Sequence, residues 1–179
     1  MASWLSVTDV GAEVELEENS DSAMGNLRFL PVGLDVQGKK CLVVGGGSVG
    51  ARKVTNLVRA GAKVTVVSPM VTESLGGQIE SGSATWVQDF FRDEHLDGVF
   101  FVVAATDNQT VNANIVSCAG NRGALVCDAS SAERSQVIFG ALHQSEDGVT
   151  VAVFTDGRDP SDSRRARDRI AEFLDQDRE

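Results

Sequence analysis

The sequence predicts an α/β fold of the doubly wound kind, with helices on both faces of a parallel sheet, followed by a small α+β segment. Three observations predict this fold class. Short apolar runs such as 98–105 (GVFFVVAA) have the composition of strands that are buried on both faces. Stretches with helical spacing of apolar residues alternate with these runs, as strand–helix–strand crossovers require. The alternation stops after residue 128, where two apolar runs follow one another without a helix between them.

The first three elements have clear local signals. Residues 40–45 (KCLVVG) form an apolar run that leads into three glycines, which is typical of a buried parallel strand. Over 48–60 apolar residues recur at helical spacing, and Gly61 has the position of a glycine that ends a helix. A second strand is expected over 63–67, closed by Ser68-Pro69.

The pattern then repeats. We expect a helix over 71–80, despite two glycines in it, and a short strand over 85–88. The run 98–105 is the strongest strand signal in the chain. A helix over 110–121 and a fifth strand over 124–127 complete the expected doubly wound sheet.

The last fifty residues have a different organisation. Strands are expected over 136–142 and 148–154, joined by a turn at 143–147, and Pro160 is expected to start an arginine-rich helix. A strand pair of this kind leaves edges and apolar faces that a two-fold partner can cover. We therefore expect a dimerisation and substrate-side segment over 128–179, and a homodimer.

Composition excludes several classes of protein. The chain has 179 residues with 42% hydrophobic and 23% charged residues, which are globular values. Its net charge of −10 argues against a nucleic-acid partner, because counterion release needs a basic surface. The longest apolar run, 99–105, is too short for a membrane span.

Residues 1–24 hold six acids and neither Lys nor Arg, and we expect a poorly ordered extension without the features of a signal peptide. The three cysteines are far apart and form no CxxC pair, which favours a reducing cytoplasm over a disulfide scaffold or a zinc site.

The motif G-x-G-x-x-G occupies residues 45–50, between an expected strand and an expected helix. In that context Gly45 permits the tight turn, Gly47 lets backbone amides approach a diphosphate, and Gly50 lets the helix close against the strand. Ser48 and Val49 then supply amides at the positive end of the helix. Residues 25–127 are therefore expected to form a Rossmann-type dinucleotide-binding domain, and the alternative is a glycine turn that binds nothing.

Two further strand ends are candidate cofactor contacts. The second strand ends in Ser68-Pro69, where a dinucleotide domain commonly has an acid for the ribose hydroxyls, so this position leaves NAD or NADP open. Thr106 and Asp107 follow the strongest strand, at the edge of the sheet where ligands of open α/β sheets bind. Asp107 or Asn108 can equally cap the next helix.

An ordered set of motifs carries a family resemblance from about Phe29 to Ile170. The motifs in chain order are Phe29-Leu-Pro-Val-Gly-Leu-Asp35, the glycine motif with Arg52-Lys53, Ala104-Ala-Thr-Asp107, Val111-Asn112, Asp128, and Thr155-Asp-Gly-Arg-Asp-Pro160 before Arg164-Arg165. With these motifs the chain resembles the precorrin-2 dehydrogenases, which include the NAD-binding module of sirohaem synthase. It departs from the family in two acids within 154–160, in Gly140 where proline is usual, and in an end at Glu179 that leaves out most of the family's C-terminal helices.

The resemblance implies a function and assigns roles to individual residues. It implies NAD-dependent oxidation of precorrin-2, a tetrapyrrole with eight carboxylate arms, to sirohydrochlorin, with Asp128 as the catalytic carboxylate and Thr155 and Arg164 as substrate contacts. Some members also insert iron, using the same aspartate. Because Asp128 follows an apolar strand, we expect burial to raise the pKa of its carboxyl towards a value useful for proton transfer.

Each assignment has a simpler alternative. Asp128 can be a turn or capping residue, and the arginines after Pro160 can belong to a solvated, salt-bridged helix. His95 and His143 have no partner at metal-ligand spacing and are expected to be solvated, His143 in the turn. For the whole chain, the alternatives are a non-catalytic NAD sensor and a degenerate relative that binds NAD without catalysis.

Overall fold

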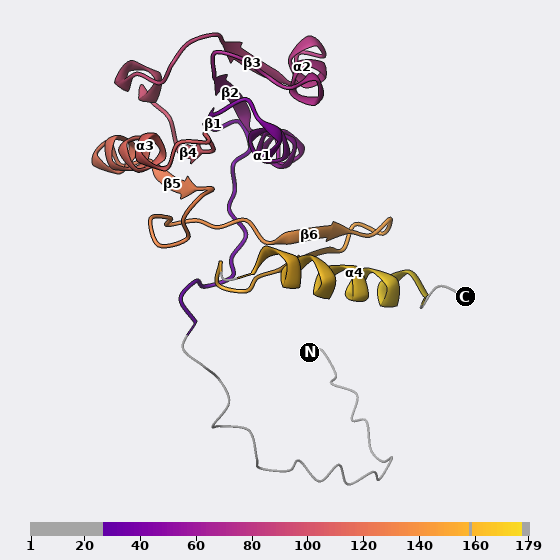
Figure 1. The fold of residues 1–179 in the computed structure, drawn as a ribbon. Coiled ribbons are helices and arrows are strands. Elements are labelled where there is room, and N and C mark those ends of the chain that lie inside the picture. The colour runs from indigo at the N-terminus through magenta and orange to yellow at the C-terminus, as the bar shows by residue number, and fades with distance from the viewer. Residues whose placement is uncertain (1–26, 158, 177–179) are drawn as a thin grey trace, which may run out of the picture.

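The computed structural model describes residues 27–157 and 159–176. The extension predicted for residues 1–24 lies outside these residues. Five strands form one parallel sheet in the order β3-β2-β1-β4-β5, which confirms the predicted doubly wound fold (Figure 1). The strands are β1 Lys40–Val44, β2 Lys63–Val67, β3 Ala84–Val87, β4 Phe101–Ala104 and β5 Leu125–Asp128.

Four helices connect these strands and cover the sheet on both sides. They are α1 Ser48–Arg59, α2 Glu73–Glu80, the single 3₁₀ turn η1 Asp93–Leu96, and α3 Gln109–Asn121. Alternate residues of β1 point to opposite faces, so Val43 joins the core beneath α1 and α2 while Leu42 joins the core beneath α3. The two apolar layers explain why the strands read as continuous apolar runs in the sequence.

The strand order reverses between β1 and β4, which places a crevice at their carboxyl ends. The first connection from β1 runs through α1 to β2 on one side, and the chain then crosses back to β4 on the other side. Ligands of open α/β sheets bind at this switch point, because the loops on either side diverge there. The glycine motif and residues 105–107 both lie at this edge.

A second, smaller unit follows β5. The antiparallel strands β6 Ala141–Gln144 and β7 Thr150–Val153 pack against α4, Pro160–Gln176. The helix runs along this hairpin in Figure 1. No helix in the described ranges 27–157 and 159–176 is long and apolar enough to cross a bilayer.

The predicted strand at 136–142 is wrong in its start, and the predicted turn at 143–147 is displaced. Residues 136–140 are irregular because they pack back onto the larger sheet: the amides of Gln136 and Val137 both bond the carbonyl of Val126. The turn forms two residues later, where the amide of Ser145 bonds Val149. His143 therefore lies in β6 and not in the turn where we had expected it, and its Nε2 is buried rather than solvated.

Candidate functional site

The glycine turn between β1 and α1 lies directly against the end of β4. Gly45 has a φ of +119°, and a Cβ there would overlap the carbonyl oxygen of Ala105. A Cβ on Gly50 would overlap the carbonyl oxygen of Gly45, so the first turn of α1 also approaches the strand too closely for a side chain. Both positions therefore require glycine for the reasons that the motif predicted.

Ser68 fastens this turn from the neighbouring strand. Its hydroxyl accepts a hydrogen bond from the amide of Gly46 at 3.0 Å and donates one to the carbonyl of Met70 at 2.6 Å. The hydroxyl proton is therefore used within the protein, and Ser68 is buried. Pro69 is held beside it, since its carbonyl accepts a hydrogen bond from Gln88 at 3.2 Å. This arrangement gives Ser68 a structural role at the site where we had expected a ribose contact.

Gly47 is the member of the motif that faces open space. It is the N-cap of α1, with φ −78° and ψ −176°, and no side chain caps the helix there. A Cβ on Gly47 would meet nothing within 4 Å. The first turn of α1 holds no acid, and Ser48 and Val49, which supply its amides, are exposed. Uncapped amides at the positive end of a helix form a site for a diphosphate, and the residues present fit that group.

The loop after β4 is organised by two asparagines. Asn108 caps α3 by accepting hydrogen bonds from the amides of Thr110 and Val111, so it takes the capping role that the sequence left open between it and Asp107. Asp107 is exposed at the crevice edge. The hydroxyl of Thr106 donates to the side-chain oxygen of Asn112 at 2.6 Å. The amide group of Asn112, which is completely buried, then donates to Ser130 at 3.2 Å.

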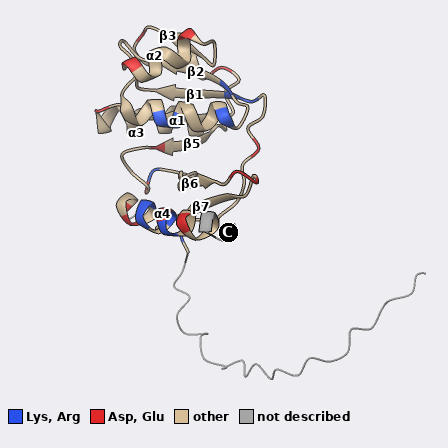
Figure 2. Cartoon of the chain, turned by 90° about the vertical axis from the view of Figure 1, so that its right-hand side faces the viewer, with Lys and Arg blue, Asp and Glu red and all other residues tan. Residues whose placement is uncertain are grey.

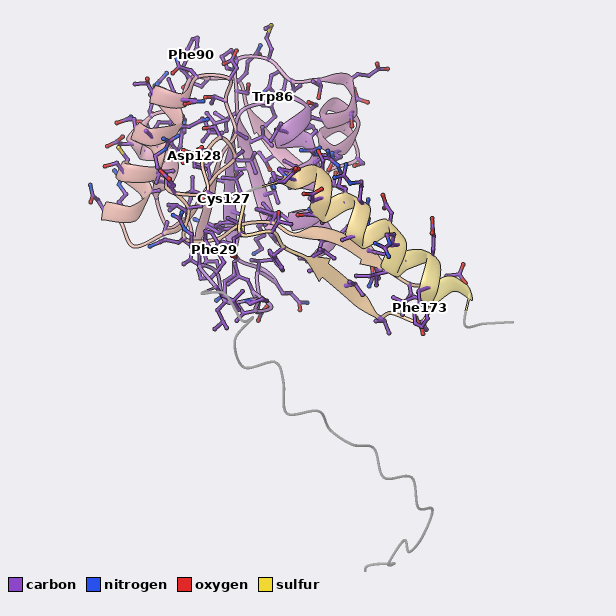
Figure 3. All side chains as sticks on the ribbon, turned by 60° about the horizontal axis from the view of Figure 1, so that its bottom comes forward. Phe29, Trp86, Phe90, Cys127, Asp128 and Phe173 are labelled. Atoms are coloured by element: carbon purple, nitrogen blue, oxygen red, sulfur yellow. The ribbon has the colours of Figure 1, made fainter. Side chains whose placement is uncertain are left out.

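Asp128 ends β5 and its carboxylate is completely buried (Figure 3). Its Oδ1 accepts hydrogen bonds from the backbone amide of Ser130 at 2.8 Å and from the hydroxyl of Ser130 at 2.6 Å. Its Oδ2 accepts one from Nε of Arg134 at 2.7 Å. The loop that follows the strand therefore supplies all three of these hydrogen bonds.

The expectation of a raised pKa for Asp128 is wrong. Burial does raise the pKa of this carboxyl, but the hydrogen bonds from Ser130 and Arg134 and the charge of Arg134 outweigh burial and hold the pKa below its ordinary value. The carboxylate is thus ionised at neutral pH. A group in this state can stabilise positive charge and accept a proton weakly, but it cannot donate one.

A cavity of about 470 Å³ lies between the two units, next to the end of β5. Its wall includes Asp128, Thr155 and residues of α1, β6, β7 and α4. Five cationic side chains line it, which is a high local density for a chain with a net charge of −10. They are Arg52, Lys53, Arg59, Arg164 and Arg167. We call this cavity the basic cleft, and Figure 2 shows basic residues on both of the helices, α1 and α4, that border it.

Lys53 packs against an aromatic ring in this cleft. Its amine lies 3.9 Å from the centroid of the Phe139 ring, which in turn stacks on Phe101 at 5.9 Å. Burial lowers the pKa of Lys53, the neighbouring Cys127 thiol raises it, and the charge of Arg52 lowers it further. An anion in the cleft would offset both effects that disfavour the charged amine.

The predicted substrate contacts both line the basic cleft. The hydroxyl of Thr155 bonds the carbonyl of Asp159 at 2.8 Å and the hydroxyl of Ser163 at 2.8 Å, which closes the turn before α4. Arg164 is exposed, and its guanidinium reaches Ser161 at 3.3 Å. The structure therefore brings Thr155 and Arg164 to the same cavity as Asp128, while the glycine motif lies at the crevice beside it.

Sequence reasoning assigned no role to several residues of the site. Asn112 had a signal, because it shares the inward spacing of Ile115 and Ala119 on α3. Arg134 and Ser130 had none, since both lie in a loop. No group of three or more His, Cys, Asp or Glu residues that could hold a metal ion occurs in the part of the chain that the structure describes.

The fold and the crevice define a dinucleotide-binding protein of the Rossmann type. A family model described as "Putative NAD(P)-binding" matches residues 32–141, which is more than half of the chain. The chain belongs to this NAD(P)-binding family, and its cofactor is a nicotinamide dinucleotide.

Relatives and a solved structure extend the similarity beyond the family model. The siroheme synthase of Photobacterium profundum is 35% identical over 148 residues, which is 83% of this chain and 31% of that protein. The siroheme synthase of Photorhabdus laumondii is 36% identical over 82% of this chain, again 31% of its own length. The structure of SirC, a precorrin-2 dehydrogenase, superposes with a TM-score of 0.69 at 29% identity, covering 80% of this chain and 70% of that one. The chain thus spans about a third of the length of these siroheme synthases.

Gly47→Ala tests the diphosphate site. The backbone of Gly47 suits any residue, so we expect the free energy of unfolding to change by less than about 1 kcal/mol. The added methyl group would stand among the uncapped amides, and we expect at least a tenfold loss of NAD affinity, measured by calorimetric titration. Gly120→Ala, in the exposed part of α3, also has nothing within 4 Å of its Cβ and is the matched control. Equal affinity of Gly47→Ala and wild type for NAD would contradict this location.

Proposed function

We propose that this chain oxidises precorrin-2 to sirohydrochlorin with NAD as the hydride acceptor, in siroheme biosynthesis. The observation that carries the proposal is the basic cleft beside the cofactor crevice, on a fold shared with SirC, a precorrin-2 dehydrogenase. The siroheme synthases that the chain resembles support the same pathway. The three cysteines are free, and we place the enzyme in the reducing cytoplasm.

The charge of the basic cleft suits this substrate. Precorrin-2 carries eight carboxylates, and arginine guanidinium groups bind carboxylates with paired hydrogen bonds. Arg52 and Lys53 on α1 lie across the cleft from Arg164 and Arg167 on α4, so one macrocycle can be held from two sides. A sensor that binds only NAD has no evident use for five cations in a second cavity.

The residues of the site have distinct tasks in the proposed reaction. The first turn of α1 would hold the diphosphate of NAD, and the bound nicotinamide supplies the acceptor for a hydride. Loss of that hydride leaves positive charge on the macrocycle. The ionised carboxylate of Asp128 lowers the energy of this charge and takes the proton that must leave, which solvent then receives. The protein thus converts precorrin-2 and NAD⁺ to sirohydrochlorin, NADH and a proton.

Turnover of precorrin-2 tests the function directly. Incubation of the purified chain with precorrin-2 and NAD should give the absorption spectrum of sirohydrochlorin, and Asp128→Asn should lower kcat at least a hundredfold, because the amide carries no charge and is not a proton acceptor. Asp97→Asn, at an exposed aspartate paired with Arg122 away from the cleft, is the matched control. If wild type binds NAD but converts no precorrin-2, the chain is a sensor or a degenerate relative.

Arg164→Gln tests the basic cleft as the carboxylate site. We expect KM for precorrin-2 to rise about tenfold, equivalent to about 1.4 kcal/mol, with less effect on kcat. Arg165→Gln is the control, because Arg165 pairs with Asp162 on the exposed side of α4 and does not line the cleft. If Arg164→Gln and Arg165→Gln changed KM for precorrin-2 equally, the basic cleft would not be the site that binds the substrate carboxylates.

We also propose that the enzyme is a homodimer, assembled through the second unit. A two-stranded sheet is marginal by itself, and β6 and β7 each have an edge that is not paired within the described chain. Apolar side chains are exposed around it: Leu142, Val149 and, on α4, Ile170 and Phe173. A second copy that covers these side chains would bury apolar surface and pair the open edges.

Phe173→Glu tests this interface. Phe173 is 62% exposed, so the substitution should leave the protomer folded, while a buried carboxylate at the interface should dissociate the dimer. Sedimentation velocity should show a dimer for wild type and a monomer for Phe173→Glu at the same concentration. Phe90→Glu is the control: Phe90 is 75% exposed and lies at the opposite end of the molecule (Figure 3). A monomeric wild type would contradict the proposal.

A further inference from the structure

The loop after β5 encloses Asp128 with an arginine that the sequence motifs did not single out. Arg134 donates from Nε to Oδ2 of Asp128 at 2.7 Å and from Nη2 to the hydroxyl of Ser130 at 3.4 Å. Ser130 donates its own proton to Oδ1 of Asp128. The guanidinium therefore spans the carboxylate and the serine that holds it. A planar fork of donors can make this pair of contacts, whereas the point charge of a lysine cannot reproduce its geometry.

This arrangement restricts which part of Asp128 can react. A carboxylate offers about four lone-pair positions, and three are filled: two on Oδ1 by Ser130 and one on Oδ2 by Arg134. Within the described residues no hydrogen bond fills the remaining position, which is on Oδ2 of a residue in the wall of the basic cleft. Arg134 itself is 36% exposed, so the guanidinium also forms the solvent side of an otherwise buried contact.

The loop is tied to the cofactor side of the sheet by a buried asparagine. Asn112 donates to the hydroxyl of Ser130 and to the carbonyl of Thr106, and it accepts from the amide of Thr106. The hydroxyl of Ser130, with one proton and two lone pairs, is fully used by Asp128, Asn112 and Arg134. The position of Asp128 is therefore fixed relative to Thr106, which follows β4 beside the cofactor crevice.

The groups around Asp128 leave Arg134 as its charged partner. The contacts from α3 come through the neutral Asn112, and Thr106 after β4 is also neutral. On the strand itself, burial raises the pKa of the neighbouring Cys127 thiol to about 11, so this group stays neutral. On α1, Lys53 lies near Cys127 and forms no ion pair with Asp128 among the described residues.

We propose that Arg134 is a positioning residue of the dehydrogenase: with Ser130 it holds the Asp128 carboxylate so that only one acceptor position, on Oδ2, is left for the proton of the substrate. This inference rests on the proposed function for the identity of the reaction, but the contact itself can be measured without turnover. The side chains that position Asp128 come from the loop of residues 129–135, and not from the strand that carries the aspartate.

The titration of the Asp128 carboxyl, followed by ¹³C NMR on protein labelled at aspartate and assigned with Asp128→Asn, tests the inference. Removal of the cation from a carboxylate that stays buried should raise its pKa, and for Arg134→Gln we expect an increase of about 1–3 pH units. Arg134→Lys should keep most of the lowered pKa, because it keeps the charge. Arg122→Gln, which breaks the exposed pair with Asp97, is the matched control and should leave Asp128 unchanged.

Kinetics then separates positioning from charge. A base works in its ionised form, so the acid limb of kcat/KM should move upwards in Arg134→Gln by the same interval as the NMR midpoint. Arg134→Lys should return the acid limb of kcat/KM to its wild-type position. It should not restore the pH-independent value of kcat, because lysine lacks the planar pair of donors that contacts Asp128 and Ser130. Ser130→Ala removes the hydroxyl bond to Oδ1 and should also raise the midpoint, so it tests the same contact if Arg134→Gln does not fold.

The outcomes distinguish this inference from the proposed function. An Asp128 midpoint that Arg134→Gln and Ser130→Ala leave unchanged would overturn the role of Arg134, whatever the activity. An NMR shift without a matching shift of the acid limb would overturn positioning for catalysis. If wild type binds NAD but does not convert precorrin-2, the proposed function fails, and the inference fails with it even if the midpoint moves.

Discussion

The contact between the glycine turn and the end of β4 is the constraint on which the site depends. A Cβ on Gly45 would overlap the backbone of Ala105, and the amide of Ala105 bonds the carbonyl of Val44, so the turn lies tightly against the end of the strand. Ser68 adds a bond from the neighbouring strand to Gly46. Three strands are thereby locked at one edge, and the amides of α1 are left open because no side chain is near enough to cap them. A diphosphate site formed in this way is preorganised before any ligand binds.

The unit that follows β5 contributes to the site by forming a cavity together with α1. Residues 136–139 pack back onto the larger sheet and place the ring of Phe139 beside the amine of Lys53, so that one face of α1 borders the basic cleft. The terminal helix supplies a second wall with Arg164 and Arg167, so cations from two helices far apart in the sequence line one cavity.

The parts of the fold that the sequence predicted are those with a local cause. The five strands could be predicted because strands packed between helices have apolar runs in the sequence. The glycine motif could be predicted because one turn requires residues without side chains. The start of the strand expected at 136–142 was misplaced because Val137 and Phe139 pack against the core of the larger sheet. Local periodicity cannot distinguish apolar residues with this role from those of a strand. The basic cleft was also out of reach, since Lys53 and Arg167 are more than a hundred residues apart in the chain.

The pKa of Asp128 shows why burial alone is a poor guide to chemistry. The neighbouring Cys127 and the apolar strand indicated desolvation correctly, and desolvation does raise the pKa of the carboxyl. The partners that reverse the outcome, Ser130 and Arg134, stand two and six residues further on, in a loop without periodicity. A general acid would need the opposite balance, with burial dominant. A carboxylate that stays ionised suits the oxidation that we propose, because positive charge would develop on the substrate before the proton leaves.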